Sequence, residues 1–147
     1  TDHPSQFFIF DFAAKKLDII ATTYQALDGQ VAAAKEKYDY TSSDGMEIPG
    51  YLTVPAGANK SNMPLIVLPH GGPNARDDQS FDWWAFFYAA RGYLVYQPNF
   101  RASTGYGSDF RDAGNGEWGR KMQDDITDGV KKLINDGGKM IIDAILL

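Results

Sequence analysis

The sequence predicts an α/β protein with a doubly wound sheet, because buried strands and amphipathic helices alternate along its second half. Two apolar runs, residues 64–69 and 93–97, are continuous rather than alternating, which is typical of strands covered on both faces. Helical patterns follow them at residues 81–90 and 122–134. The order strand, helix, strand, helix therefore favours a sheet with helices on both sides.

Length and composition exclude several classes of protein. The chain has 147 residues, of which 44% are hydrophobic and 14% aromatic, so it can build a core and is not generally disordered. A net charge of −5 argues against a nucleic-acid partner. The absence of cysteine excludes disulfides, thiolate zinc sites and a cysteine nucleophile.

Hydropathy and the first residues indicate the compartment of the chain and whether it is part of a longer protein. No apolar run approaches the roughly 18 residues of a membrane-spanning helix, so we expect no membrane partner. We expect a soluble chain, with the cytoplasm slightly favoured and the periplasm or secretion left open. The sequence begins at Thr1 in the middle of a pattern, which predicts a piece of a longer protein.

The first 37 residues predict a small β element and a connection. Strand-forming residues at 6–12 and 17–20 flank a polar turn and favour an antiparallel hairpin. Such a hairpin buries too little apolar area to fold alone. Residues 21–39 are small and polar and are interpreted as a connecting segment with a short helix.

From residue 38 the pattern changes to that of an α/β domain. Residues 46–54 predict a strand, and Pro49 places it at an edge or a bulge. Asp82 is the expected N-cap of the helix that ends before Gly92. Residues 99–119 are rich in Gly, Ser and Asn, and predict a long loop with one helical turn.

The last helix has a clear apolar face, with Met122, Ile126, Val130, Leu133 and Ile134 at helical spacing. The charged residues between them are expected to face solvent: Asp124, Asp125, Asp128, Lys131 and Lys132. Residues 140–147 form a final apolar run whose type the pattern leaves open.

Two motif-like patterns do not predict a cofactor or a metal. Residues 114–119 match G-x-G-x-x-G, but no buried strand precedes them to present a helix to a pyrophosphate. Asp124, Asp128 and Gly129 imitate part of an EF-hand loop, yet Ile126 occupies a ligand position. Only two histidines are present, far apart in sequence. We therefore expect neither a cofactor nor a metal ion.

The segment that most suggests chemistry is His70-Gly71-Gly72-Pro73, directly after a buried strand. Consecutive glycines let a backbone approach a ligand closely and direct N–H groups into a pocket. An oxyanion site of this kind stabilises charge on a carbonyl oxygen during acyl transfer. From these residues alone, a plain turn at the strand end is an equally good interpretation.

The neighbouring motifs shift that balance. In order and spacing, the chain over residues 38–136 resembles the catalytic domain of the prolyl oligopeptidase family of serine peptidases, and within it the acylaminoacyl-peptidase and dipeptidyl-aminopeptidase-like members. The motifs that carry the resemblance are residues 44–52, His70–Pro73, Arg91-Gly92-Tyr93, residues 97–107, Gly116–Gly119 and Gln123-Asp124-Asp125. Ala102 departs from the glycine usual in the family.

The resemblance implies a division of the chain and a fold for each part. Residues 1–37 are similar to a last propeller blade and linker, and residues 38–147 to the N-terminal half of an α/β-hydrolase domain. The parent activity is then hydrolysis of peptide bonds near the N-terminus of short peptides, with no cofactor. The backbone N–H of Gly72 is the oxyanion donor, with His70 and Gly71 as loop neighbours.

The family's nucleophile motif, G-x-S-x-G, is missing from this sequence. Arg101 occupies the first glycine position before Ser103, so Ser103 is not expected to replace the nucleophile. His70 corresponds to the oxyanion loop, and His3 has no catalytic counterpart. We therefore expect no Ser, Asp or His of a triad in this chain, and no activity of the chain alone.

Two further functions remain open. The chain is a truncated, non-catalytic remnant that forms homo-oligomers through exposed strand edges, or it is a piece of a carboxylesterase on the same fold. The proline after the glycines and the loop at residues 99–107 favour the peptidase group over the esterase.

Overall fold

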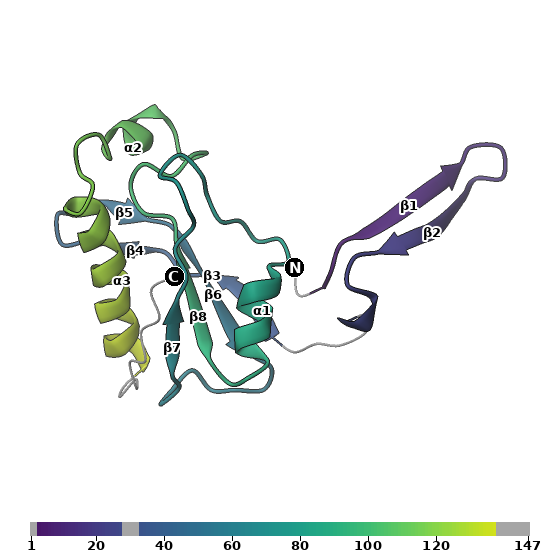
Figure 1. Ribbon diagram of the computed structural model, residues 1–147, viewed down its shortest axis with the longest axis horizontal. Helices are drawn as coiled ribbons and strands as arrows, with labels where there is room; N and C mark the ends of the chain where they lie inside the picture. The colour runs from purple at the N-terminus through teal and green to yellow at the C-terminus, as the bar shows by residue number, and fades with distance from the viewer. Residues whose placement is uncertain (1–2, 28–32, 138–147) are drawn as a thin grey trace.

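A computed structural model describes residues 3–27 and 33–137 of the chain. It consists of a layered α/β body and a β-hairpin that extends away from it (Figure 1). The elements in chain order are β1 (Gln6–Asp11), β2 (Lys16–Thr22), a 3₁₀ turn (Gln25–Leu27), β3 (Ala33–Lys37), β4 (Tyr40–Thr41), β5 (Glu47–Ile48), β6 (Gly50–Pro55), β7 (Leu65–Val67), α1 (Trp83–Ala89), β8 (Leu94–Pro98), α2 (Ser108–Asp112) and α3 (Lys121–Gly137). The apolar run at 140–147 lies outside the described residues.

The body is built on a four-stranded mixed sheet in the order β3-β6-β8-β7. Strands β7 and β8 are parallel, whereas β6 is antiparallel to both β3 and β8. Within the described part of the chain, β7 has a neighbour on one side only. The connection between the parallel strands carries α1, as expected for a crossover that packs on the sheet.

Alternating side chains of the buried strands supply two cores. Leu94 and Tyr96 point to the side on which α3 packs, in a cluster that includes Ile126. Val95 points to the opposite side and packs with Ala85 of α1. Figure 1 shows the same arrangement, with α1 and α3 on opposite faces of the sheet. The predicted doubly wound architecture is thereby confirmed for this part of the sheet.

The predicted helix at 81–90 is confirmed as α1, together with its N-cap. The Asp82 carboxylate accepts hydrogen bonds from the backbone N–H groups of Trp84, at 2.8 Å, and Ala85, at 3.1 Å. These two donors would otherwise lack intrahelical partners. The cap therefore fixes where the helix begins.

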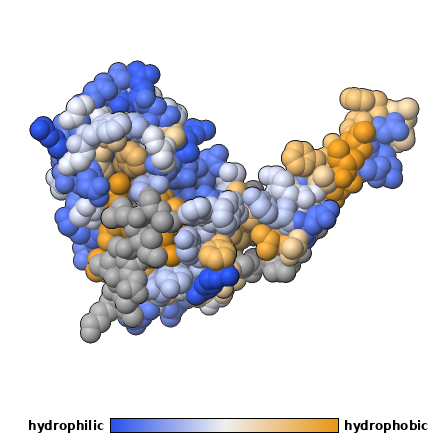
Figure 2. Space-filling model, in the orientation of Figure 1, coloured by the Kyte–Doolittle hydropathy of each residue, from blue (hydrophilic) through white to orange (hydrophobic). Residues whose placement is uncertain are grey.

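The predicted N-terminal hairpin is also confirmed, with β1 and β2 paired antiparallel. Its apolar side chains on both faces are exposed, from 46% for Phe10 to 85% for Phe12, the aromatic at the turn. Figure 2 shows this hydrophobic surface along the extended arm. The hairpin thus folds without covering its own apolar residues.

Two strand predictions need correction. Residues 33–37 lie in β3, not in a connecting segment, because their backbone pairs with β6. The strand predicted at 46–54 is divided at Pro49 into β5 and β6, since proline has no N–H for the ladder. The larger part, β6, lies in the middle of the sheet and not at its edge.

One face of α3 also differs from the prediction. Asp125 was expected to face solvent, but it is completely buried and accepts hydrogen bonds from Arg101. Gly129, on the same helix, lies directly over Tyr96 of β8. A Cβ built there would stand 2.1 Å from the tyrosine oxygen, so only glycine lets the helix approach the sheet this closely.

The loop at 99–119 contains the predicted helical turn, α2. Ala102 within it has a φ of +83°, a left-handed conformation that favours glycine. Its methyl group faces Gly114, where an added Cβ would stand only 2.3 Å away. The departure from glycine at position 102 therefore falls where the backbone geometry calls for glycine.

Candidate active site

Two loops meet at the carboxyl edge of the parallel strands. Strand β7 leads into residues 68–82, and β8 leads into residues 99–107. The Leu68 N–H still donates to the Tyr96 carbonyl at 2.8 Å, so the first loop leaves the sheet in register with β8. Ligand sites of open α/β sheets lie at this edge.

Gly72 lies in the first loop, beside a cavity of about 300 Å³. Its φ of +64° lies in the left-handed region, which favours glycine, and a Cβ built there would meet no atom within 4 Å. The other walls of this cavity are mostly apolar and come from both loops and from α3: Pro69, His70, Pro73, Phe100, Trp118, Gly119, Met122, Gln123 and Ile126. Gly72 is thus placed at the wall of a concavity.

His70 is brought next to Ser103, from the second loop. Its Nε2 lies 2.8 Å from the Ser103 Oγ, and its ring stacks on Phe100 with centroids 4.7 Å apart. Burial lowers the pKa of His70 below its ordinary value. A serine and a neutral histidine in contact resemble a nucleophile and its base.

The hydrogen bonds assign these two residues other roles. Ser103 is completely buried, and its hydroxyl lies 2.6 Å from the Phe100 carbonyl, which can only accept. The one hydroxyl proton is therefore donated to that carbonyl, and His70 must donate from Nε2–H to Oγ. A histidine that donates to the serine cannot remove its proton, so the pair is not an activated nucleophile.

Polar side chains from β8 hold the far part of the first loop. The Gln97 amide nitrogen donates to the carboxylates of Asp77, at 3.1 Å, and Asp82, at 3.0 Å. Asn99 accepts from the Asp77 N–H at 2.8 Å and donates to its carbonyl at 3.0 Å. These bonds fix the segment between Gly72 and α1.

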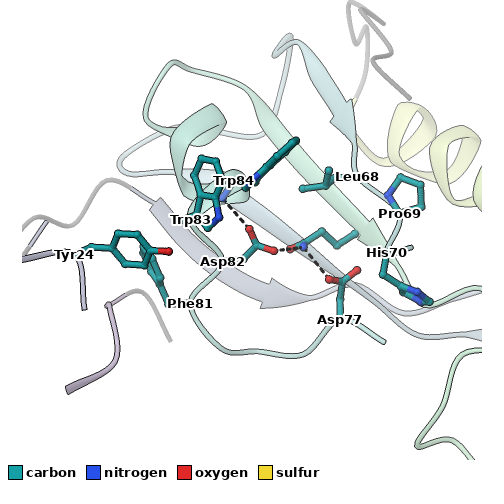
Figure 3. A pocket seen from close by; sticks show the side chains of 10 residues that line it. Tyr24, Leu68, Pro69, His70, Asp77, Phe81, Asp82, Trp83 and Trp84 are labelled. Atoms are coloured by element: carbon teal, nitrogen blue, oxygen red, sulfur yellow. Dashed lines mark hydrogen bonds between the residues drawn. The ribbon is translucent and has the colours of Figure 1, made fainter. Parts of the chain in front are cut away.

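Gln97, Asp77 and Asp82 form one side of a second cavity, of about 360 Å³, which His70 also lines. In Figure 3, Asp77 and Asp82 lie at its centre and Trp83, Trp84 and Phe81 flank it, with Tyr24 facing Phe81. Burial raises the pKa of Asp77 to about 6, and neighbouring carboxylates add to the effect against the opposing charge of Lys35. This acidic, aromatic cavity adjoins the glycine loop.

A buried ion-pair network anchors the second loop. The Arg101 guanidinium contacts Asp125 at 2.6 Å and Asp44 at 2.9 Å, and its backbone N–H donates to Asp125 at 3.0 Å. Hydrogen bonds from Arg101 and Ser42 lower the pKa of Asp44. The network ties the loop to α3 and to the turn between β4 and β5.

Motifs in the sequence mark the glycines but not these supporting residues. Gln97, Asn99 and Arg101 are 1%, 0% and 4% exposed, polar residues at the end of a buried strand. Their clustering directly after an apolar run was the available signal, since buried polar groups need partners. His3 lines neither cavity. The nucleotide-like segment at 114–119 follows α2 and not a strand, and it contributes Trp118 and Gly119 to the wall of the first cavity.

Across residues 3–27 and 33–137, no group of three or more His, Asp or Glu side chains could hold a metal ion. None of the helices in that same part of the chain is long and apolar enough to cross a membrane.

Sequence comparison shows which known proteins the chain resembles. The model of the prolyl oligopeptidase family matches residues 79–144. The dipeptidyl aminopeptidase BIII of Pseudoxanthomonas mexicana is 36% identical over 141 residues, which cover 91% of this chain and 20% of that protein. The chain is similar to the prolyl oligopeptidase family over these residues. A second relative, dipeptidyl peptidase family member 6 of Caenorhabditis elegans, is 34% identical over 158 residues, covering 93% of this chain and 21% of that protein.

Solved structures of peptidases share the fold. A puromycin-hydrolyzing peptidase of Mycobacterium tuberculosis aligns with a TM-score of 0.77 at 23% identity, over 97% of this chain and 24% of that one. An acylaminoacyl peptidase of Pyrococcus horikoshii aligns with a TM-score of 0.72 at 20% identity, over 95% and 23%. The predicted partial α/β-hydrolase fold with a short β element before it is confirmed. The chain spans about a fifth of the length of its curated relatives.

Proposed function

We propose that this chain supplies the oxyanion side of a serine peptidase active site, with the Gly72 N–H as one donor. The observation that carries the proposal is the position of Gly72: left-handed, next to a cavity, at the carboxyl edge of the parallel strands. In α/β-hydrolases one oxyanion donor comes from a loop at this edge and the other from the residue after the nucleophile. The parent substrate would be a short peptide, cleaved near its N-terminus.

The chemistry divides between this chain and a nucleophile that it does not contain. The attacking serine and its base create a tetrahedral intermediate, and its negative oxygen needs two preorganised donors. Backbone N–H groups serve well because their dipoles are fixed before the reaction begins. We assign residues 38–147 to this hydrolase part and residues 1–37 to a propeller-like part with its linker, although residues 33–37 pair with the hydrolase sheet as β3.

The isolated chain is therefore expected to be inactive. Ser103 has its proton committed to the Phe100 carbonyl, and no G-x-S-x-G is present in the sequence. Incubation with a fluorophosphonate probe, followed by intact-mass measurement, should show no stoichiometric adduct. A serine labelled one-to-one would contradict the assignment of roles.

The role of Gly72 is tested by removing its N–H alone. Residues 38–137 would replace the equivalent segment in the Pseudoxanthomonas dipeptidyl aminopeptidase, and semisynthesis would place an ester in the backbone at Gly72. Loss of one oxyanion donor is expected to lower kcat by about 10²-fold or more. The same ester at Gly57, in a distant turn, is the control, and equal rates for the two esters would refute the role.

The same chimera distinguishes the two alternative functions. If the chimera cleaves ester substrates and not dipeptidyl amides, the carboxylesterase alternative is favoured. A non-catalytic, self-associating role is supported by the exposed apolar hairpin and by the edge of β7, which has no second neighbour among the described residues. That role predicts a folded but inactive chimera, together with oligomers of the isolated chain.

A further inference from the structure

The glycine pair that carries the proposed oxyanion donor has open space on the side where a side chain would stand. A Cβ built at either Gly71 or Gly72 would meet no atom within 4 Å, whereas the His70 ring interacts with the backbone of both. Glycine also has the freest backbone of all residues. The orientation of the Gly72 N–H must therefore be imposed by the residues on each side of the pair.

On the far side, the second loop already holds the chain. The Thr104 N–H donates to the Ala75 carbonyl at 2.9 Å, and Asn99 binds the backbone of Asp77. On the near side, the residue directly before Gly71 is His70, and its ring is held in two ways. It stacks on Phe100, and it donates to the buried hydroxyl of Ser103.

We propose that Ser103 is a positioning residue, which locks His70 as the Nε2–H tautomer and so fixes the Gly71–Gly72 backbone. The inference rests on the proposed role of Gly72, and it assigns Ser103 no contact with substrate. The hydroxyl acts as a relay: it donates to the Phe100 carbonyl and accepts from His70. The second loop, itself anchored by Arg101 and Asp125, thereby holds both ends of the glycine pair.

The geometry explains why the lock has a single state. The Phe100 carbonyl can only accept, so Ser103 cannot reverse its donor direction without losing that bond. In the other neutral tautomer Nε2 carries no proton, so its hydrogen bond to Ser103 would be lost. Burial disfavours the imidazolium, against the smaller opposite effect of the Gly71 and Gly72 backbone.

Nuclear magnetic resonance of the full chain tests the lock without any need for activity. Ring ¹⁵N shifts should show one tautomer for His70, protonated at Nε2, and relaxation should show an ordered Gly71–Gly72 backbone. In Ser103→Ala we expect both tautomers and a mobile glycine pair. Ser103→Thr, which keeps the hydroxyl, should restore the single tautomer.

A merely structural role would give a different pattern. The control is Leu133→Ala, which removes a buried side chain of α3 far from the loop in sequence. It should lower stability, as Ser103→Ala does, but leave the His70 tautomer unchanged. The proposal is overturned if Ser103→Ala lowers stability while the His70 shifts and glycine relaxation stay as in the parent chain. That result would leave the Gly72 ester experiment untouched, and failure of the ester experiment would leave this lock intact.

Discussion

Ala102 shows how a single methyl group sets the energy of a loop. Its φ of +83° places the Cβ against the following carbonyl, which costs an L-residue roughly 1–2 kcal/mol. The strain persists because the surrounding bonds determine the backbone: the Ala102 N–H donates to the Phe110 carbonyl at 3.1 Å. The loop therefore keeps a glycine conformation without a glycine.

We expect Ala102→Gly to raise the free energy of unfolding by about 1 kcal/mol, after the extra backbone entropy of glycine in the unfolded chain is subtracted. Urea denaturation measures this change in the free energy of unfolding. The control is Ala90→Gly, the same change at a φ of −61°, which should lower stability instead. Equal signs for the two variants would show that position 102 is unstrained.

Asp77 gives the protein a pH dependence opposite to that of most carboxylates. Its folded pKa of about 6 exceeds the ordinary 3.8, so the native state binds its proton more tightly than the unfolded state. Stability from this group is full below about pH 4, falls as pH rises toward about 6, and stays low above that value.

Asp77→Asn should consequently be more stable than the parent chain, by roughly 1–2 kcal/mol at pH 7.5 and less at pH 4.5. Unfolding curves at the two pH values give the difference. Asp78→Asn is the matched control. Hydrogen bonds from Ser80 lower the pKa of Asp78, so its contribution is present at neutral pH and is lost in acid. A gain for Asp77→Asn that does not grow with pH would contradict this account.

The secondary-structure elements divide into those that local sequence decides and those that pairing decides. Strands β7 and β8 and helix α1 were predictable because apolar runs and an N-cap mark them. Strand β3, with the sequence AAKEK, carries no strand signal, and only its register with β6 makes it a strand. Local propensity cannot predict a strand that forms only because it pairs with another strand.

Helix α3 shows the same limit for charged residues. Its apolar spacing predicted which side faces the sheet, but the burial of Asp125 depends on an arginine 24 positions earlier. The site supports followed the same rule: the glycines were visible as a motif, whereas Gln97, Asn99 and Arg101 acquire roles only through partners distant in sequence.

We expect Asp125→Ala to lower the free energy of unfolding by about 3–5 kcal/mol, because it leaves part of the buried Arg101 guanidinium unpaired. Thermal and urea unfolding both report this change. Asp124→Ala, at an exposed neighbouring position, should change stability by less than about 0.5 kcal/mol. A loss below about 1 kcal/mol at position 125 would mean that Asp44 alone satisfies the arginine.

At the scale of the whole molecule, the unusual property is an apolar arm. Eight large hydrophobic residues of the hairpin are at least 46% exposed, whereas the body keeps its aliphatic residues inside. Burial of apolar area is worth about 25 cal/mol per Å², so an arm of this composition favours contact with another surface. A net charge of −5 opposes such contact weakly at physiological salt.

The isolated chain should therefore self-associate at micromolar concentration, as measured by light scattering. The double variant Phe8→Lys with Ile19→Glu replaces a directly paired apolar couple by opposite charges, which keeps the hairpin and the net charge. It should shift the chain toward monomer. Trp118→Gln, which removes an exposed aromatic outside the hairpin, should not. A parent chain that is strictly monomeric would refute the prediction.

The contact between Ala102 and Gly114 also restricts the order in which this loop can change by mutation. The positions have room for one methyl group between them, since a Cβ at 114 would stand 2.3 Å from the one at 102. Gly114→Ala should be strongly destabilising in the present background and much less so after Ala102→Gly. The two sites are thus epistatic. Alanine is tolerated at position 114 only when position 102 is glycine, so the substitution at 102 must come first.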